Sequence, residues 1–295
     1  MAEMSLPVQP EPAVPYISQR RRAWRTFVRN RTAVIGLLMV LTIVVVAVAA
    51  PILSPHDPIK QAPRERLSPP SAEYPLGQDD YGRDILSRII YGARISLMVG
   101  ILSVLGGGLL GTAMGIVAGY KGGRIENVLM RIVDILLAFP DLITGVLVLA
   151  VLGSGLFKMI IAIALVISPR FARQAYGTTL SIKKREFVEA ARAIGVGDFR
   201  MLRLHILPNV VGELLVLGSL WTASAIRIEA NLSFIGLGVP PPTPTWGQMI
   251  RSGTPHLTNA PWFSIFPGLA ILFTVLAFNL LGDGLRDVFD PKLYE

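Results

Sequence analysis

The sequence predicts an all-α, polytopic membrane protein with six transmembrane helices. Only 16% of its 295 residues are charged and 52% are hydrophobic, whereas soluble domains carry roughly 25% charged residues. Three stretches, 32–56, 95–120 and 252–282, contain no Asp, Glu, Lys or Arg. Each is longer than the ~20 apolar residues with which a helix crosses a bilayer, so we expect the chain to span a membrane several times.

Composition also narrows the kinds of metal, redox and catalytic chemistry that the chain can perform. The chain has no cysteine, which excludes disulfides, thiolate metal sites and cysteine nucleophiles. Its three histidines, His56, His205 and His256, lie far apart in sequence, so no histidine metal site is expected. A net charge of +8 could indicate nucleic-acid binding, but basic loops on the cytoplasmic side explain it in a membrane protein. No nucleic-acid partner is therefore expected.

The first span is expected at 33–53, directly after a cluster of six arginines. Residues 1–32 are predicted to form a cytoplasmic tail. A signal peptide is the alternative, because 47–49 (Ala-Val-Ala) resembles a cleavage site. The apolar run and the leader before it are both long for a signal peptide, which favours a retained span.

The segment 54–93 is predicted to be a loop on the periplasmic side, because it is rich in proline and polar residues. Its stretch "DDYGRD" at 79–84 could suggest a metal site, but the spacing of a calcium-binding loop is missing. We expect a loop held together by salt bridges.

Residues 94–284 are predicted to contain the other five spans. Asp134, Asp141 and Lys158 interrupt the third and fourth of the six, which leaves the ends of these two the least defined. Gly107, Gly111 and Gly115 lie four apart in the second span, a spacing that lets two helices approach closely. The five spans are expected at 95–119, 128–152, 156–171, 214–236 and 263–282.

Basic residues predict the orientation. Lys and Arg are concentrated in the N-terminal tail and between 170 and 203, and cytoplasmic loops carry an excess of both. Both termini, including a C-terminal tail at 285–295, and a charged segment at 178–209 are therefore predicted to be cytoplasmic.

The charged segment begins with a predicted amphipathic helix. Glu186, Glu189, Ala190 and Ala193 share one face of it. Ala191 is a further small residue that keeps the helix thin, which leaves room for the surface of another protein.

A sharp turn and a second helix are predicted next. Gly195 and Gly197 can adopt a left-handed conformation that ends the first helix. Asp198 can cap the second helix, and Pro208 can end it. On these residues alone, a solvated loop and a docking site for another protein both stay open.

A resemblance favours docking. "EAARAIG" followed by "LP" twelve residues after the glycine resembles the EAA motif of ABC-importer membrane subunits. His205 stands where that motif commonly has isoleucine, although "HILPN" is usual in the peptide and nickel branch. The matching residues are Glu189, Ala190, Ala191, Gly195, Leu207 and Pro208.

Two further stretches resemble the same family. "LGQDDYGRDILSRIIYGARISL" at 76–97 is similar to its "LGTDxxGRDxxSRxxxGxRxSL", with Gln78 replacing threonine. "EANLSFIGLGVPPPTPTWGQMI" at 229–250 is similar to its "EAxLSFLGLGxxPPxPxWGxML". The chain thus resembles, over nearly all of 24–290, the C-type permease subunit of dipeptide and oligopeptide importers, within the peptide, nickel and opine family.

This resemblance implies a type I importer permease fold and a transport subunit that is not an enzyme. The EAA segment would be the coupling helix, which docks on an ATPase. The implied partners are a homologous permease, two ATPase subunits, and a periplasmic or lipid-anchored binding protein. Because the chain lacks a GxxxxGK[ST] phosphate loop, ATP and Mg are expected on the ATPase subunits and no cofactor on this chain.

The solute is left open among dipeptides, oligopeptides, nickel chelates, glutathione and opines. The alternative function is an ion-gradient-driven secondary transporter, which predicts intramembrane carboxylates and inverted repeats. Charged residues inside a membrane are often functional, so Asp141, Arg227 and Glu229 are candidates either for the pathway or for helix assembly. Arg227 and Glu229 are two apart and do not share a helix face.

Overall fold

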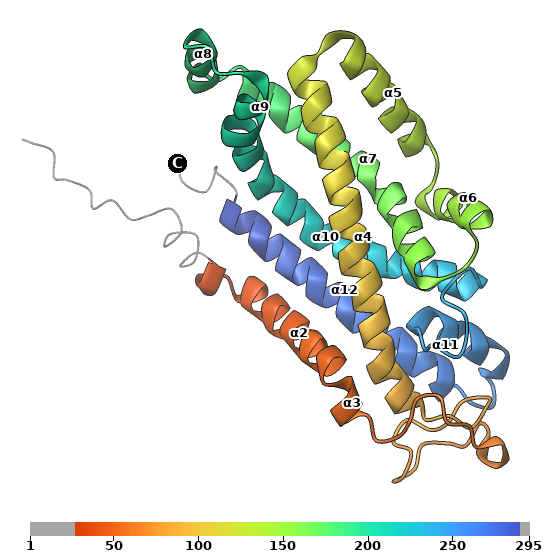
Figure 1. The fold of residues 1–295 in the computed structure, drawn as a ribbon. Helices are drawn as coiled ribbons and strands as arrows, with labels where there is room; N and C mark the ends of the chain where they lie inside the picture. Colours follow the sequence, from red (N-terminus) through yellow and green to blue (C-terminus); the bar gives the residue numbers. More distant parts are fainter. Residues whose placement is uncertain (1–26, 290–295) are drawn as a thin grey trace, which may run out of the picture.

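The computed structural model describes residues 27–289 and confirms the all-α fold class for them (Figure 1). Its only strand-like feature in this part is an isolated bridge between Gln78 and Asp84. Most of the predicted tail 1–32 and the end of the predicted tail 285–295 lie outside the described residues. The main helices are α2 (Arg31–Val48), α3 (Ala50–Leu53), α4 (Ile85–Lys121), α5 (Gly123–Ala138), α6 (Asp141–Leu152), α7 (Leu156–Lys183), α8 (Glu186–Ala193), α9 (Asp198–Met201), α10 (Leu207–Ile235), α11 (Trp246–Gly253) and α12 (Trp262–Phe289).

The long helices α2, α4, α7, α10 and α12 run side by side as a bundle (Figure 1). One end of the bundle carries α8 and α9, and the other carries the loop after α3 together with α11. The start of α2 and the end of α12 both lie toward the end that carries α8. A single chain therefore presents two different polar ends, separated by apolar helices.

Membrane-length helices account for fewer spans than the six predicted. Four helical stretches are long and apolar enough to cross a bilayer, at Arg31–Val48, Ile85–Lys121, Asp198–Ile235 and Trp262–Val288. A fifth is obtained if the bent pair α5 and α6 counts as one span. The predicted span 156–171 lies within α7, which packs along α4 but is not one of these candidates. The number six is therefore not confirmed.

The third predicted span, 128–152, is not one continuous helix. It is broken between α5 and α6, whose axes differ by 101°. Pro140 explains the break, because a proline donates no backbone hydrogen bond and pushes the residue before it out of the helical region. Phe139 accordingly has an extended backbone, with φ −91° and ψ 141°.

Several predicted boundaries shift. Helix α4 begins at Ile85, inside the predicted loop 54–93, because Asp84 caps it and accepts a hydrogen bond from the Ser87 amide at 2.9 Å. The first span divides at Ala49 into α2 and α3. Helix α12 extends into the predicted tail 285–295.

The glycine spacing in α4 does bring two helices together, as predicted. A Cβ on Gly107, Gly111 or Gly115 would collide with a carbonyl oxygen of α7. The three oxygens belong to Ala164, Ser168 and Ala172, which are also four apart. The backbones of α4 and α7 therefore touch along a continuous line, which only glycine permits.

Candidate functional sites

The EAA segment forms a compact unit from α8 to the first turn of α10, hereafter called the docking segment after the role that the EAA resemblance implies. It consists of α8, a turn, α9, a π-helical stretch at Leu202–Ile206, and the start of α10. In Figure 1 it projects at one end of the bundle. This path matches the predicted helix, turn and helix.

Gly195 produces the turn. Its φ is +81°, a left-handed conformation that side chains disfavour. The Val196 amide donates to the Ala191 carbonyl at 3.1 Å and the Gly195 amide to the Arg192 carbonyl at 3.0 Å, which is the bonding pattern of a Schellman motif. Gly197 was expected to be left-handed as well, but its φ of −67° is accessible to any residue, so that expectation is wrong.

The inner face of the docking segment packs on the bundle. Val188 and Ala191 of α8, with Met201 and Ile206, are buried in one apolar cluster. Ala191 is only 7% exposed, so it faces the bundle and not a partner, contrary to the prediction. The bundle contributes Ile116, Tyr120, Ala175 and Ile182 to this cluster.

Asp198 fixes the second helix, but not as the predicted cap. The cap of α9 is Gly197, and no side chain caps the helix. The Asp198 carboxylate instead accepts a hydrogen bond from the Tyr120 hydroxyl at 2.8 Å and pairs with Lys121 Nζ at 2.5 Å. Lys183 Nζ donates to the Tyr120 carbonyl at 2.7 Å. The ends of α4, α7 and α9 are thus tied together.

The outer face of the docking segment is open. All four residues of the predicted face of α8 are exposed, as are two large apolar side chains at the turn, Ile194 (82%) and Phe199 (75%). Exposed apolar groups beside charges are typical of a protein contact. The face residues are Glu186, Glu189, Ala190 and Ala193.

Pro208 does not stop the second helix. It lies in the first turn of α10, next to the half-exposed Leu207. A proline is tolerated in a first turn because its missing amide would have no partner there. The π-helical stretch therefore leads directly into α10, and the predicted stop is wrong.

Glu229 and Arg227 occupy different environments, as their spacing predicts. Glu229 is fully buried between two serines: Ser96 Oγ of α4 donates to Oε2 at 3.1 Å, and Ser233 Oγ donates to Oε1 at 2.8 Å. Arg227 is exposed, and its side chain has no partner among the described residues.

Asp141 lies at the bend between α5 and α6. Its carboxylate pairs with Arg170 of α7 at 2.6 Å. The Arg170 guanidinium also lies 4.5 Å from the ring centre of Trp221 in α10. One turn further along α7, Arg173 pairs with Asp134 of α5. Two ion pairs therefore hold the broken helix pair against α7.

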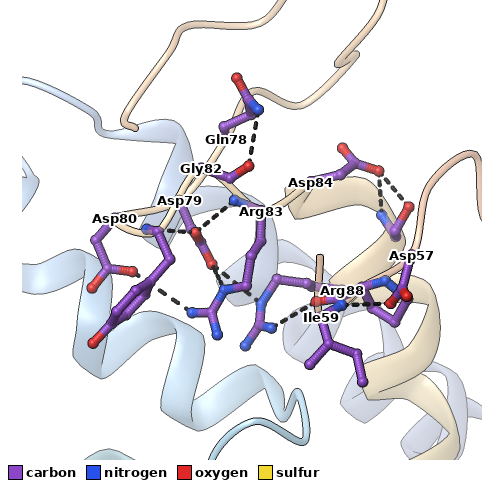
Figure 2. A network of polar contacts seen from close by, with 12 residues as sticks. Asp57, Ile59, Gln78, Asp79, Asp80, Gly82, Arg83, Asp84 and Arg88 are labelled. Carbon is purple, nitrogen blue, oxygen red and sulfur yellow. Dashed lines mark hydrogen bonds and ion pairs between the residues drawn. The ribbon is translucent and has the colours of Figure 1, made fainter. Parts of the chain in front are cut away.

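Salt bridges do hold the "DDYGRD" loop (Figure 2). Asp79 is fully buried and pairs with Arg83 Nε at 2.7 Å and with Arg88 Nε at 3.4 Å. Its other oxygen accepts from the amides of Tyr81 and Arg83, both at 2.9 Å. Among residues 27–289 no three His, Cys, Asp or Glu side chains gather as metal ligands would.

A long apolar groove of about 810 Å³ was not foreseen. It lies between α4 and α10 and reaches Phe199 of the docking segment. Its lining includes the exposed leucines Leu105, Leu109 and Leu215. No local signal marks these side chains, because α4 and α10 are mostly apolar and packing decides which apolar face stays open.

A bundle of apolar helices that are long enough to cross a bilayer is the architecture of a polytopic membrane protein. The chain belongs to the family described as "Binding-protein-dependent transport system inner membrane component", whose model matches residues 111–294. A second model, "N-terminal TM domain of oligopeptide transport permease C", matches residues 18–70. The chain is therefore a multi-pass inner-membrane permease subunit of an ABC importer, and not an enzyme.

The curated relatives are also permease proteins of transport systems. The dipeptide transport system permease protein DppC of Alkalihalophilus pseudofirmus is 40% identical and aligns with 96% of this chain and 93% of its own length. The glutathione transport system permease protein GsiD of Pectobacterium atrosepticum is 45% identical, covering 92% and 91%. Neither relative is described as a gradient-driven secondary transporter.

A solved structure shares the fold. An inward-facing MetNI methionine ABC transporter chain superposes with a TM-score of 0.57 and 19% identity. The match covers 69% of this chain and 97% of the other. It supports the predicted importer permease fold.

Proposed function

We propose that this chain forms half of the translocation pathway of an importer for short peptides. The relatives named for dipeptide and glutathione transport support peptide-like solutes, because each aligns with over nine-tenths of this chain. Both solutes carry amide bonds and at least one free carboxylate. Neither of these two relatives is named for nickel or opine transport.

We further propose that the other half is a homologous permease, and that two ATPase subunits and a substrate-binding protein complete the importer. The apolar groove between α4 and α10 supports the homologous permease as a partner, since exposed leucines along a spanning helix suit a helix–helix contact. The docking segment lies in the cytoplasm, with both termini. The loop 54–84 then lies on the periplasmic side.

The docking segment is the observation that carries the ATPase contact. Its inner face is buried and its turn is fixed by Gly195, while Glu189, Ala190 and Ile194 stay exposed. A small rigid unit of this kind can transmit a movement of the ATPase to α7 and α10. Ala191 acts from inside by seating α8, and Leu207 and Pro208 set where α10 begins.

The charged residues of the spans divide into two roles. Asp141, through Arg170, and the buried Glu229, through its two serines, serve helix assembly. Arg227 is exposed and unpaired within the described residues, and a cation in a span needs a polar partner. We assign Arg227 either to the translocation pathway or to a contact with the second permease.

Reconstitution tests this proposal. The permease pair, the ATPases and the binding protein are incorporated in liposomes, and ATP-driven uptake of a labelled dipeptide is compared with ATP hydrolysis. Glu189→Lys should reduce uptake at least tenfold while the assembly still inserts. Glu73→Lys, an exposed charge reversal in the loop at the other end, should leave uptake unchanged. Normal uptake by Glu189→Lys would refute the docking role, and absent dipeptide uptake by the wild type would refute the solute.

A further inference from the structure

A small, partly open cavity lies at the end of the bundle opposite the docking segment, where the loop after α3 meets α11. Its volume is about 260 Å³, many times the space that one bridging water needs. Pro241, Met249 and Phe263 give it apolar walls. Its polar lining residues are Gln61, Tyr81, Arg83, Arg88, Gln248 and Ser252.

Both arginines of this cavity are buried and short of acceptors. Their side chains are only 8% and 3% exposed. Each guanidinium makes a single hydrogen bond within the described residues, from Arg83 Nε to Asp79 at 2.7 Å and from Arg88 Nη1 to the Pro58 carbonyl at 2.9 Å. Arg88 Nε is buried without a hydrogen-bond partner among the described residues, and it calls for an acceptor because buried polar groups are normally satisfied. The other unpaired nitrogens of the two groups are not fully buried, so they can donate to a ligand in the cavity.

The neighbouring carboxylates do not supply the missing acceptors. Asp79 already accepts from two backbone amides and from Arg83 Nε, and its distance of 3.4 Å to Arg88 is too long for a good hydrogen bond. Asp80 lies 3.7 Å from Arg83. Asp80 Oδ1 is itself buried without a hydrogen-bond partner in the described part of the chain, and burial and the like charge of Asp79 raise the pKa of the Asp80 carboxyl.

The two guanidinium groups are held in place before any ligand binds. The Arg83 guanidinium lies 4.5 Å from the ring centre of Tyr81, and Arg88 is fixed by the Pro58 carbonyl. Figure 2 shows the two groups side by side below Asp79. Planar donors fixed in this way bind carboxylates with little loss of entropy.

We propose that this cavity is a carboxylate-binding site, in which Arg83 and Arg88 hold the free carboxylate of a short peptide. The identity of the ligand rests on the proposed peptide import, whereas the preference for a carboxylate rests on the arginines alone. Gln248 Oε1 is buried without a hydrogen-bond partner among the described residues. It can accept from an amide N–H of the same ligand.

Calorimetry tests the site on the assembled permease complex in nanodiscs, without soluble binding protein, at pH 7 and low salt. The probes are glycylglycine, glycylglycinamide and propionate. Glycylglycine and propionate should bind saturably, and the amide, which lacks the carboxylate, at least tenfold more weakly. Ser252→Met fills the cavity without touching the ion pairs. It should weaken the binding of both glycylglycine and propionate at least tenfold. Asn259→Met, an exposed change at the same end, should have no effect.

The outcomes separate the site from the proposed function. Propionate binding without glycylglycine binding keeps the carboxylate site and overturns the peptide as its ligand. The carboxylate site would be overturned by no saturable binding of either carboxylate, by equal binding of the amide, or by full binding to the Ser252→Met variant. Loss of dipeptide uptake in liposomes with intact propionate binding would refute peptide import but not the site.

Discussion

The Tyr120 hydroxyl donates a 2.8 Å hydrogen bond to the Asp198 carboxylate, which joins the end of α4 to the start of α9. This contact links a membrane-length helix directly to the docking segment. Together with the Lys121 ion pair, it gives a route by which a movement of the segment can reach the glycine-lined contact of α4 with α7.

Replacing Tyr120 tests this link. Tyr120→Phe removes one hydrogen bond, worth about 1 kcal/mol. The hydrogen-bonded amides of Met201 and Leu202 should therefore exchange with deuterium about fivefold faster in nanodiscs. Tyr91→Phe, which removes a hydroxyl of α4 that has no hydrogen bond among the described residues, is the control. Equal exchange in both variants would show that the Tyr120 hydrogen bond does not stabilise the segment.

The two glycines of the turn should respond differently. Gly195→Ala forces an alanine into a left-handed conformation at φ +81°, at a cost of about 1 to 2 kcal/mol. No neighbouring atom would clash with its Cβ, so the loss comes from the backbone alone. Gly197→Ala, equally free of clashes but at φ −67°, should be neutral. Thermal unfolding of the segment and ATP-driven uptake are measured for both variants. If Gly195→Ala has no effect on either, Gly195 does not produce the turn.

Glu229 distinguishes assembly from transport. Glu229→Gln keeps polar atoms next to both serine hydroxyls and should retain most of the stability and uptake. Glu229→Ala leaves a cavity and two unpaired hydroxyls, and should destabilise the protein by about 2 to 4 kcal/mol, seen as a lower melting temperature. A stable but inactive Glu229→Gln would instead identify the carboxylate as a pathway group.

Asp80 should make the loop sensitive to pH. Burial, and then the charge of Asp79, raise its pKa above the ordinary value of 3.8, against weaker opposing effects of Arg83 and His256. The folded protein therefore binds this proton more tightly than the unfolded chain. The stabilising contribution is present at low pH and is lost as the pH rises through the folded pKa.

The variant Asp80→Asn isolates the effect of this titration on stability. Asp80→Asn removes the titration, so its melting temperature should rise relative to that of the wild type as the pH increases from 4 toward neutrality. A constant difference between the two proteins across that range would show that Asp80 is not the group responsible.

The sequence alone identified the all-α membrane class, a close helix contact at the glycines of α4, the salt-bridged loop and the turn at Gly195, but not that α7 is the partner of α4. These features depend on local rules: the length of apolar runs, the spacing of glycines, and the conformation that a residue without a side chain can adopt. Pro140 was also a visible signal of the bend, but the length of the apolar run outweighed it.

Tertiary structure alone decided which residues meet. Local rules predict Asp198 as a helix cap, yet its partner Tyr120 lies 78 positions away. They also predict Ala191 on an open face, whereas packing buries it. The cavity between Arg83, Arg88 and Gln248 combines three segments whose approach depends on how the whole bundle packs. Local periodicity cannot encode such contacts, because they are fixed by the shapes of side chains on helices that are distant in sequence.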